Sequence, residues 1–414
     1  MVGGMVSKCN RLQNPPSQIE CEGVIDEAGG IMVPKARKSV RPTLIFIIAI
    51  LFAASNSLSA QTGRWTEEKA KSWYDQQPWL VGSNYIPTNA INELEMWQSQ
   101  TFDPGQIDKE LGWAEDMGMN TMRVFLHDLL WQENPTGFKK RMDKFLEISS
   151  KHHIKPLFVL FDSCWDPNPK LGLQHPPVPG VHNSGWVQSP GAAALNDPGQ
   201  QERLKAYVVG VVGAFANDSR VLGWDVWNEP SNTNDGSYRK QELKNKAQVV
   251  EEMLPKVFSW AREAHPSQPL TSGVWDIDFM KGTPATKTQQ IQLENSDVIT
   301  FHNYGWPESF ESEVLFLQKL NRPVFCTEYM ARGAGSTFDT VLPVAKKYKV
   351  GAINWGFVAG KTQTYYPWDS WRHPYIVDEP AVWFHEVLHP DGKPYREAEV
   401  KLIRDLTGRG KPTS

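Results

Sequence analysis

Two glutamates that each close a short apolar run have the residue type and placement for proton transfer and nucleophilic attack. Glu229 closes the run VLGWDVWNEP, and Glu328 follows residues 323–327 in RPVFCTEYMA. Pro230 cannot donate to a sheet ladder and pushes the preceding residue toward extended geometry, so Glu229 is predicted at the last position of a strand. Carboxylates at the carboxyl ends of parallel strands are placed where barrels do chemistry. Such a pair is suited to cleavage of a glycosidic bond.

The elements that must position these glutamates are predicted to be eight extended apolar segments separated by helical stretches. The segments are apolar throughout and do not alternate, which is typical of strands in a parallel sheet covered by helices. The fold class expected is α/β, a single-domain (β/α)8 TIM barrel. The predicted strands are residues 79–85, 121–125, 156–161, 221–229, 270–275, 298–304, 323–328 and 350–355.

Helical signals fill the gaps between these strands. Asp103-Pro104 is a good cap and first-turn pair for a helix over residues 104–117. Residues 241–264 place apolar side chains at helical spacing, and residues 383–406 are expected to supply the last helix. An open doubly wound sheet is the competing architecture. It is disfavoured because VGSNYIPTNA, after the first predicted strand, holds no glycine-rich phosphate loop.

Composition narrows the function classes. Of the 414 residues 40% are hydrophobic and 22% charged, and the formal net charge is −4, which gives no general attraction for nucleic acid. The chain contains 17 Trp, whose broad apolar faces suit the C–H faces of sugar rings, although most large aromatics pack in cores. A carbohydrate is therefore the expected partner.

The amino end is predicted to be an export signal preceded by extra sequence. Residues 1–31 are expected to be a disordered upstream extension, residues 32–60 a signal peptide, and residues 61–414 the catalytic domain. An apolar stretch at 44–54 follows a basic segment and precedes small residues at 57–60. The stretch is short for a bilayer span, so cleavage is favoured over an uncleaved membrane anchor. We expect a secreted or periplasmic, soluble and monomeric product without stable membrane insertion.

Two long connections follow predicted strands at the active end, over residues 162–198 and 356–375. Their aromatic content predicts walls of a cleft, since disordered segments are poor in aromatics. Cys164 and Cys326 would remain after signal cleavage, on opposite sides of a barrel, and are expected to be two free, mostly buried thiols.

The motifs around both glutamates resemble those of a known group of enzymes. W-N-E-P at Glu229 and T-E-Y at Glu328 look like the retaining barrel glycosidases of clan A, especially glycoside hydrolase family 5. The resemblance covers most of residues 75–360. It implies that Glu229 is the acid/base and Glu328 the nucleophile. Further matches are Arg123, which would keep the nucleophile ionised, Asn228 for the sugar 2-hydroxyl, His302 and Tyr304 as a strand-6 pair, and Trp355 beneath the sugar.

Physical reasoning supports the same two roles. Arg123 and the Tyr304 hydroxyl would depress the pKa of Glu328 through an opposite charge and a hydrogen bond. Glu229, flanked by Trp227 and Pro230, would have a less polar setting that raises its pKa. His302 taken by itself would be read as a satisfied core histidine.

The chain also departs from the family pattern. Its third predicted strand ends FDSCWDP, where the family commonly carries a histidine facing the cleft, and Ser163 and Cys164 offer no equivalent. Asp162, Trp165 and Asp166 are candidates for another sugar contact, against the alternative of a capped turn. Three further residues are weaker candidates for the cleft border, namely Asn84, Tyr85 and Trp306.

The expected function is a retaining β-glycoside hydrolase that acts on a β-linked glucan, mannan or xylan without cofactor or metal. No H-E-x-x-H and no G-x-S-x-G occurs, which disfavours a zinc hydrolase and a serine esterase. Two alternatives stay open: a transglycosylase, which shares the covalent intermediate, and a barrel that binds carbohydrate without cutting it.

Overall fold

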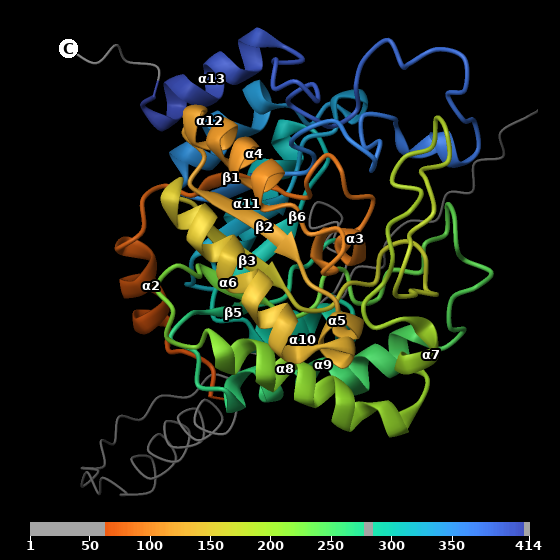
Figure 1. Ribbon diagram of the computed structural model, residues 1–414. Coiled ribbons are helices and arrows are strands. Elements are labelled where there is room, and N and C mark those ends of the chain that lie inside the picture. Colours follow the sequence, from red (N-terminus) through yellow and green to blue (C-terminus); the bar gives the residue numbers. More distant parts are fainter. Residues whose placement is uncertain (1–62, 277–284, 410–414) are drawn as a thin grey trace, which may run out of the picture. The chain divides into compact units, whose positions relative to one another are not determined.

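The computed structural model describes residues 63–276 and 285–409 (Figure 1). The predicted extension at 1–31 and signal peptide at 32–60 lie outside these residues. An eight-stranded parallel sheet runs in the order β5-β4-β3-β2-β1-β8-β7-β6. Its strands are β1 (Val81–Asn84), β2 (Thr121–Phe125), β3 (Lys155–Val159), β4 (Gly223–Asp225), β5 (Leu270–Thr271), β6 (Ile299–His302), β7 (Val324–Glu328) and β8 (Gly351–Asn354).

The two outer strands of this order meet and nearly close the sheet into a barrel. Val274, just beyond β5, forms a parallel bridge with Phe301 of β6. The Val274 N–H donates to Thr300 O at 3.0 Å, and the His302 N–H donates to Val274 O at 2.9 Å. The predicted (β/α)8 barrel is thereby confirmed.

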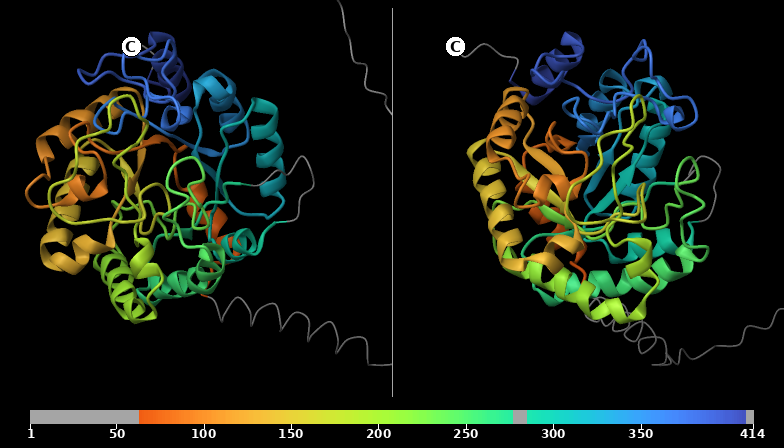
Figure 2. Two further views of the ribbon diagram at one scale, coloured as in Figure 1. Left: turned by 90° about the vertical axis from the view of Figure 1, so that its right-hand side faces the viewer. Right: turned by 45° about the vertical axis from the view of Figure 1, so that its right-hand side comes forward.

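Helices form a ring around the strands, which is seen most clearly in the left view of Figure 2. They are α2 (Glu67–Asp75), α3 (Glu93–Trp97), α4 (Pro104–Asp116), α5 (Asp128–Glu133), α6 (Pro135–Lys151), α7 (Ala192–Leu195), α8 (Gln201–Ala214), α9 (Lys246–Glu263), α10 (Lys287–Asn295), α11 (Pro307–Gln318), α12 (Phe338–Lys347) and α13 (Glu397–Thr407). Short 3₁₀ turns are η1 (Pro198–Gln200), η3 (Arg332–Ala334) and η4 (Trp368–Trp371). In the two described ranges, none of the helices combines the length and apolar character that crossing a membrane requires.

The strands are buried along nearly their whole length, as expected for a sheet covered by helices. Adjacent strands approach closely at Gly82 of β1, where an added Cβ would lie 1.8 Å from Thr121 O. Several strands are shorter than predicted. β4 ends at Asp225 and not at residue 229. Beyond β4, isolated hydrogen bonds join the chain to the segment after β3, such as the one from the Asn228 N–H to Phe161 O at 2.8 Å.

The helix predictions are correct for α4 and too long at two other places. Asp103 caps α4 by accepting from the N–H groups of Gly105 and Gln106. α9 begins at Lys246 and not at residue 241, because residues 238–245 form hydrogen-bonded turns and not a helix. α13 begins at Glu397 and not at residue 383, because residues 383–396 pair with the connection after β8 instead, for example through Val358 and Leu388.

The end of the barrel opposite the glutamates is filled by an apolar cluster. Trp73 and Tyr74 of α2 pack against this cluster and so cover it. Its buried members are Leu80, Leu157, Leu222, Val298, Phe325 and Ile353. Because this end is sealed by side chains, polar groups gather at the carboxyl ends of the strands, as is usual for this fold.

Candidate active site

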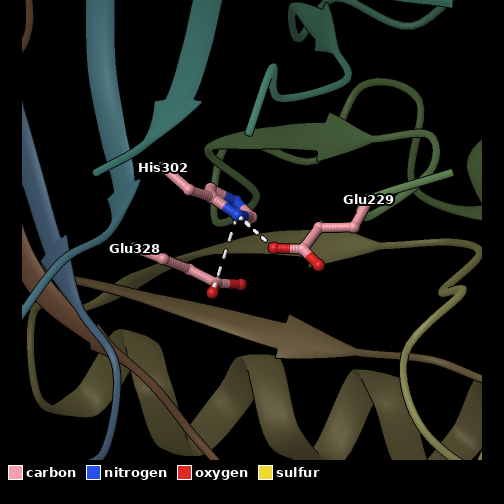
Figure 3. A group of neighbouring side chains, drawn as sticks. All are labelled: Glu229, His302 and Glu328. Atoms are coloured by element: carbon pink, nitrogen blue, oxygen red, sulfur yellow. Dashed lines mark hydrogen bonds and ion pairs between the residues drawn. The ribbon is translucent and has the colours of Figure 1, made fainter. Parts of the chain in front are cut away.

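The two glutamates meet across one pocket. Glu328 is the last residue of β7, and Glu229 lies beyond the end of β4. One ligand atom from each of Glu229, His302 and Glu328 lies within 4.8 Å of the others. Figure 3 shows the three side chains converging, with His302 placed between the carboxyl groups. Both glutamates are buried, with 8% and 5% exposure.

The backbone of Glu229 is not extended, so that prediction is wrong. Its φ is +41°, in the left-handed region that non-glycine residues adopt rarely and at a cost of about 1–3 kcal/mol. The reason is a turn, in which Glu229 O accepts from the Asn232 N–H at 2.9 Å. A strand continued to Pro230 would forgo this turn. Strain of this kind occurs where surrounding contacts hold a functional side chain in place.

Glu328 is bound by two groups that favour its charged form. Arg123 Nη1 donates to Oε1 at 2.8 Å, and the Tyr304 hydroxyl donates to Oε2 at 2.8 Å. Arg123 is fully buried and is itself held by Asp225, with Nη2 and Nε at 2.8 and 3.1 Å from Oδ2. Asn228 Oδ1 also accepts from Arg123 Nη2. The guanidinium therefore joins β2, β4 and β7 beneath the pocket.

The predicted depression of the Glu328 pKa is wrong in net direction. Burial raises this pKa above its ordinary value, and the charge of Glu229 raises it further. Arg123 and the Tyr304 hydroxyl lower the pKa, so they act in the predicted sense but do not outweigh burial.

Glu229 has a different set of partners. Its Oε2 accepts from Asn232 Nδ2 at 2.7 Å and from the Cys164 thiol at 3.2 Å. His302 Nδ1 lies 2.9 Å from its Oε1. Burial raises the pKa of Glu229, as predicted, and Cys164, Asn232 and Arg123 oppose that rise. No cation contacts this carboxyl group among the described residues, in contrast to Glu328.

His302 lies between the two carboxyl groups (Figure 3). Its Nδ1 is 2.9 Å from Glu229 Oε1 and 3.6 Å from Glu328 Oε2. Burial lowers the pKa of His302 to about 4, so the ring is neutral near neutral pH. These three residues are spaced closely enough to hold a metal ion. The positive charge beside Glu328 is already supplied by Arg123, so the pair does not require one.

Most of the residues predicted from sequence line one cavity of about 320 Å³. These are Trp165, Asn228, Glu229, Tyr304, Glu328 and Trp355. The Asn228 amide is engaged below the pocket, since its Nδ2 donates to Asp162 Oδ1 at 2.9 Å. Asp162 also accepts from the Cys164 N–H at 3.0 Å, which is the capped turn weighed as the alternative for this segment.

Three predicted residues lie elsewhere. Tyr85 is buried, and its hydroxyl donates to Glu110 Oε2 at 2.8 Å. Asn84 is beneath the pocket, where its Oδ1 accepts from Arg123 Nη1 at 3.0 Å and its Nδ2 donates to Thr327 O at 2.8 Å. Trp306 is 68% exposed, precedes α11 and is not part of the pocket wall. Asn84 thus positions the charged groups, whereas Trp306 contacts none of the clustered site residues.

Sequence reasoning missed Asp225, Asn232 and Cys164. Asp225 was detectable as an acid inside an apolar strand, and Asn232 as an amide just after Glu229. Cys164 gave no signal, because its contact with Glu229 joins residues far apart in the chain. Both Cys164 and Cys326 are free, as expected, and Cys326 is buried whereas Cys164 is partly exposed.

The long connections supply part of the pocket wall. Trp165 from residues 162–198 and Trp368 and Trp371 from residues 356–375 line it, as predicted for cleft walls. Trp186, in contrast, is buried against Phe125 and donates to Asp162.

Comparison with known proteins agrees with this architecture. The family model described as Glycosyl hydrolase family 10 matches residues 176–292. No curated protein sequence matches the chain.

Similar solved structures include a variant of GH5_18 from Streptomyces cattleya in complex with Manb1-4GlcNAc, at 13% identity, TM-score 0.53 and 81% coverage of both chains. An exo-beta-1,4-mannosidase from Opitutaceae bacterium strain TAV5 has 19% identity and TM-score 0.53, covering 81% of this chain and 60% of that one. An endo-beta-1,4-mannanase from Thermotoga petrophila has 15% identity and TM-score 0.51, covering 81% and 78%. Together with the eight-stranded barrel, these solved structures show the (β/α)8 barrel fold, and the family-model match relates residues 176–292 to the glycosyl hydrolases.

Proposed function

We propose that this protein is a retaining β-glycoside hydrolase that acts on a β-linked poly- or oligosaccharide of the glucan, mannan or xylan type. The observation that carries the proposal is the approach of Glu229 and Glu328, whose ligand atoms lie within 4.8 Å. Retaining glycosidases hold their carboxyl groups about 5–5.5 Å apart, whereas inverting enzymes need about 6.5–9.5 Å to admit a water. The short separation favours direct attack by one carboxylate.

Glu328 is the nucleophile in this proposal. Arg123 and the Tyr304 hydroxyl each bind one of its oxygens, which favours the carboxylate over the acid. Glu229 is the acid/base, because burial raises its pKa and, unlike Glu328, no cation contacts it among the described residues. A neutral His302 can accept the Glu229 proton at Nδ1 in a hydrogen bond and so orient the acid.

The reaction runs in two displacements. Glu229 gives its proton to the glycosidic oxygen while Glu328 forms an ester to the anomeric carbon, and the leaving group departs as an alcohol. Ester formation removes the charge of Glu328, and the loss of a nearby like charge favours the carboxylate form of Glu229, which then acts as the base. Glu229 then takes a proton from water, whose oxygen attacks the anomeric carbon and releases Glu328 as a carboxylate.

The substrate class rests on the pocket wall and on the structural neighbours. Trp165, Trp355, Trp368 and Trp371 offer flat apolar faces suited to sugar rings. The neighbours that carry the fold include an exo-β-1,4-mannosidase and an endo-β-1,4-mannanase, so β-1,4-linked mannosides are the first substrates to test. We also propose that the protein is secreted or periplasmic, on the basic, apolar and small-residue pattern of residues 32–60.

A 2-deoxy-2-fluoro mannoside or glucoside with an activated leaving group tests the nucleophile. The inhibited protein, digested and analysed by mass spectrometry, should carry one glycosyl group on Glu328. An adduct on another residue, or inversion in product NMR, would contradict the proposal.

Replacement of the acid gives an independent test. Glu229→Gln should lose most turnover of substrates with poor leaving groups. On activated aryl glycosides, whose departure needs no proton, it should keep the first displacement, seen as a burst of aryl alcohol, while the second displacement becomes slow for want of the base. Added azide should restore the rate on activated substrates by attacking the glycosyl ester. Equal losses on both substrates would argue against the acid role of Glu229.

A further inference from the structure

The two long connections join across one side of the barrel mouth. They are residues 162–198 after β3 and residues 356–375 after β8, yellow-green and blue at the right of Figure 1. β3 and β8 are not adjacent, since β2 and β1 stand between them. The Asn183 N–H donates to Thr362 O at 2.8 Å, and the Tyr375 N–H donates to Gly180 O at 3.0 Å. The junction therefore extends over the ends of β1 and β2.

Buried side chains fix this junction. His182 is 1% exposed, and its Nδ1 lies 2.8 Å from Tyr366 O while its backbone N–H donates to Ser370 Oγ at 2.9 Å. Gln363 Nε2 donates to Val178 O at 2.9 Å. Burial lowers the pKa of His182 to about 4, so the ring is neutral and the contact does not depend on pH near neutrality. The junction is therefore a wall of the site that buried hydrogen bonds hold in place.

The 3₁₀ turn η4 extends this wall across the mouth of the barrel through the contacts of its two tryptophans. Trp371 stacks on Trp165, with ring centroids 5.3 Å apart and planes at 13°, and meets the edge of Tyr238 at 5.3 Å. Tyr238 follows β4, which stands opposite β8 in the strand order. At the other end of η4, Trp368 contacts Tyr304 after β6 at 5.1 Å. Trp165, Trp368 and Trp371 line the same cavity as the glutamates, so they bound it on this side, which is called the enclosed side below.

The pocket also continues past the turn that begins at Glu229, into a second cavity. Asn232, Asp235 and Trp275 belong both to its wall and to that of a neighbouring cavity of about 410 Å³. The described wall of this second cavity is polar, including Ser231, Thr233 and Asp276. The proton of Glu229 goes to the glycosidic oxygen, beyond which the leaving group lies. We place the leaving group in this second cavity, which has room for it, so that the attacked sugar faces the enclosed side.

We propose that the protein cleaves from the non-reducing end of a β-linked chain, releasing one sugar per event, and does not cut internally. The attacked sugar occupies the enclosed side, so no further sugar can extend from its non-reducing end. This inference rests on the proposed function. The solved structures with this fold include both exo- and endo-acting enzymes, so the distinction comes from the junction of the two connections.

A β-1,4-mannohexaose with a fluorophore at its reducing end tests the direction of cleavage, with the cellohexaose analogue run in parallel. We expect free monosaccharide from the first time point, and labelled products that shorten by one sugar at a time. Labelled products of several lengths at the first time point, or labelled monosaccharide before the intermediate lengths have formed, would overturn the inference. Cleavage of neither chain, with no 2-fluoro adduct on Glu328, would refute the proposed function itself.

Opening the wall gives a second readout. Trp371→Ala should produce labelled fragments of intermediate length and lower the viscosity of soluble mannan severalfold faster than wild type at equal monosaccharide release. Trp371→Phe keeps an aromatic ring there and should retain the wild-type pattern. Trp113→Ala, which removes an indole from α4 far from the pocket, is the matched control. An unchanged product pattern in a folded Trp371→Ala, judged by circular dichroism, would contradict the role of η4 as a barrier.

Discussion

Removal of the Cys164 thiol should shift the pH dependence of the reaction. The thiol lies 3.2 Å from Glu229 Oε2, and burial raises the pKa of Cys164 so that the group stays protonated and donates. This bond stabilises the carboxylate form of Glu229 and opposes the rise of its pKa. In Cys164→Ala the carboxylate loses one donor while the acid form loses little, so the pKa of Glu229 should rise.

The size of the effect follows from the donor chemistry. Hydrogen bonds to charged groups contribute about 1.5–3 kcal/mol, and a thiol is a weak donor. The thiol should therefore stabilise the carboxylate form of Glu229 by about 1 kcal/mol. Since 1.36 kcal/mol corresponds to one pKa unit, the alkaline limb of kcat/KM should move roughly half to one pH unit higher. Asn232 Nδ2 still donates to the same oxygen at 2.7 Å, which keeps the shift from being larger.

The assay is the pH profile of kcat/KM on a glycoside with a poor leaving group, because only then does the proton of Glu229 limit the rate. Cys164→Ser is the matched control. Its hydroxyl is a stronger donor than a thiol, so its alkaline limb should stay in place or move lower. A limb that moves lower in Cys164→Ala, or moves equally in both variants, would refute the reasoning.

Three further predictions concern the charged groups. Arg123→Gln should lower the free energy of unfolding by about 3–5 kcal/mol in denaturant titration, because it leaves Asp225 buried without its cation, and a loss below 1 kcal/mol would contradict the ion-pair account. Glu313→Gln should remove a pH dependence of the free energy of unfolding, because burial raises the pKa of Glu313 to about 8 in the folded protein. The stability that the protonated Glu313 contributes is fully present below the pKa of the unfolded state and is lost as the pH rises through about 8. Wild type should therefore lose more unfolding free energy than the variant between pH 5 and pH 9, and equal losses would count against it. Dialysis against a chelator should leave kcat unchanged, since Arg123 already provides the positive charge at Glu328; loss of activity that zinc or another divalent ion restores would show a metal at the Glu229, His302 and Glu328 group.

The barrel could be predicted from sequence because its signal is local. Strands buried on both faces read as continuous apolar runs, and all eight observed strands overlap the predicted segments. The ends of elements were less predictable. The start of α9 and the left-handed backbone of Glu229 both depend on turns within the connection that follows β4. Local preferences, such as the effect of Pro230 on the residue before it, were overridden by those contacts.

The site was predictable where residues sit on strands or directly follow them. Arg123, Tyr304 and Glu328 are held by the sheet, so strand order alone brings them together. Cys164 reaches Glu229 from a connection whose path depends on its junction with residues 356–375. No spacing rule in the sequence encodes such a contact, because the two connections come from strands that are not neighbours.

Asp225 gives a physical reason for the different roles proposed for the two glutamates. One guanidinium, Arg123, contacts both Asp225 and Glu328, and His302 is neutral near pH 7 because burial lowers its pKa to about 4. Two carboxylates on one buried cation already leave an excess negative charge, and ionisation of Glu229 would add a second in a setting where unpaired charge is costly. The proton therefore stays on Glu229, the carboxyl group that Arg123 does not touch. Asp225→Asn should relax this constraint and move the alkaline limb of kcat/KM to lower pH, and a limb that stays in place would show that burial alone protonates the acid.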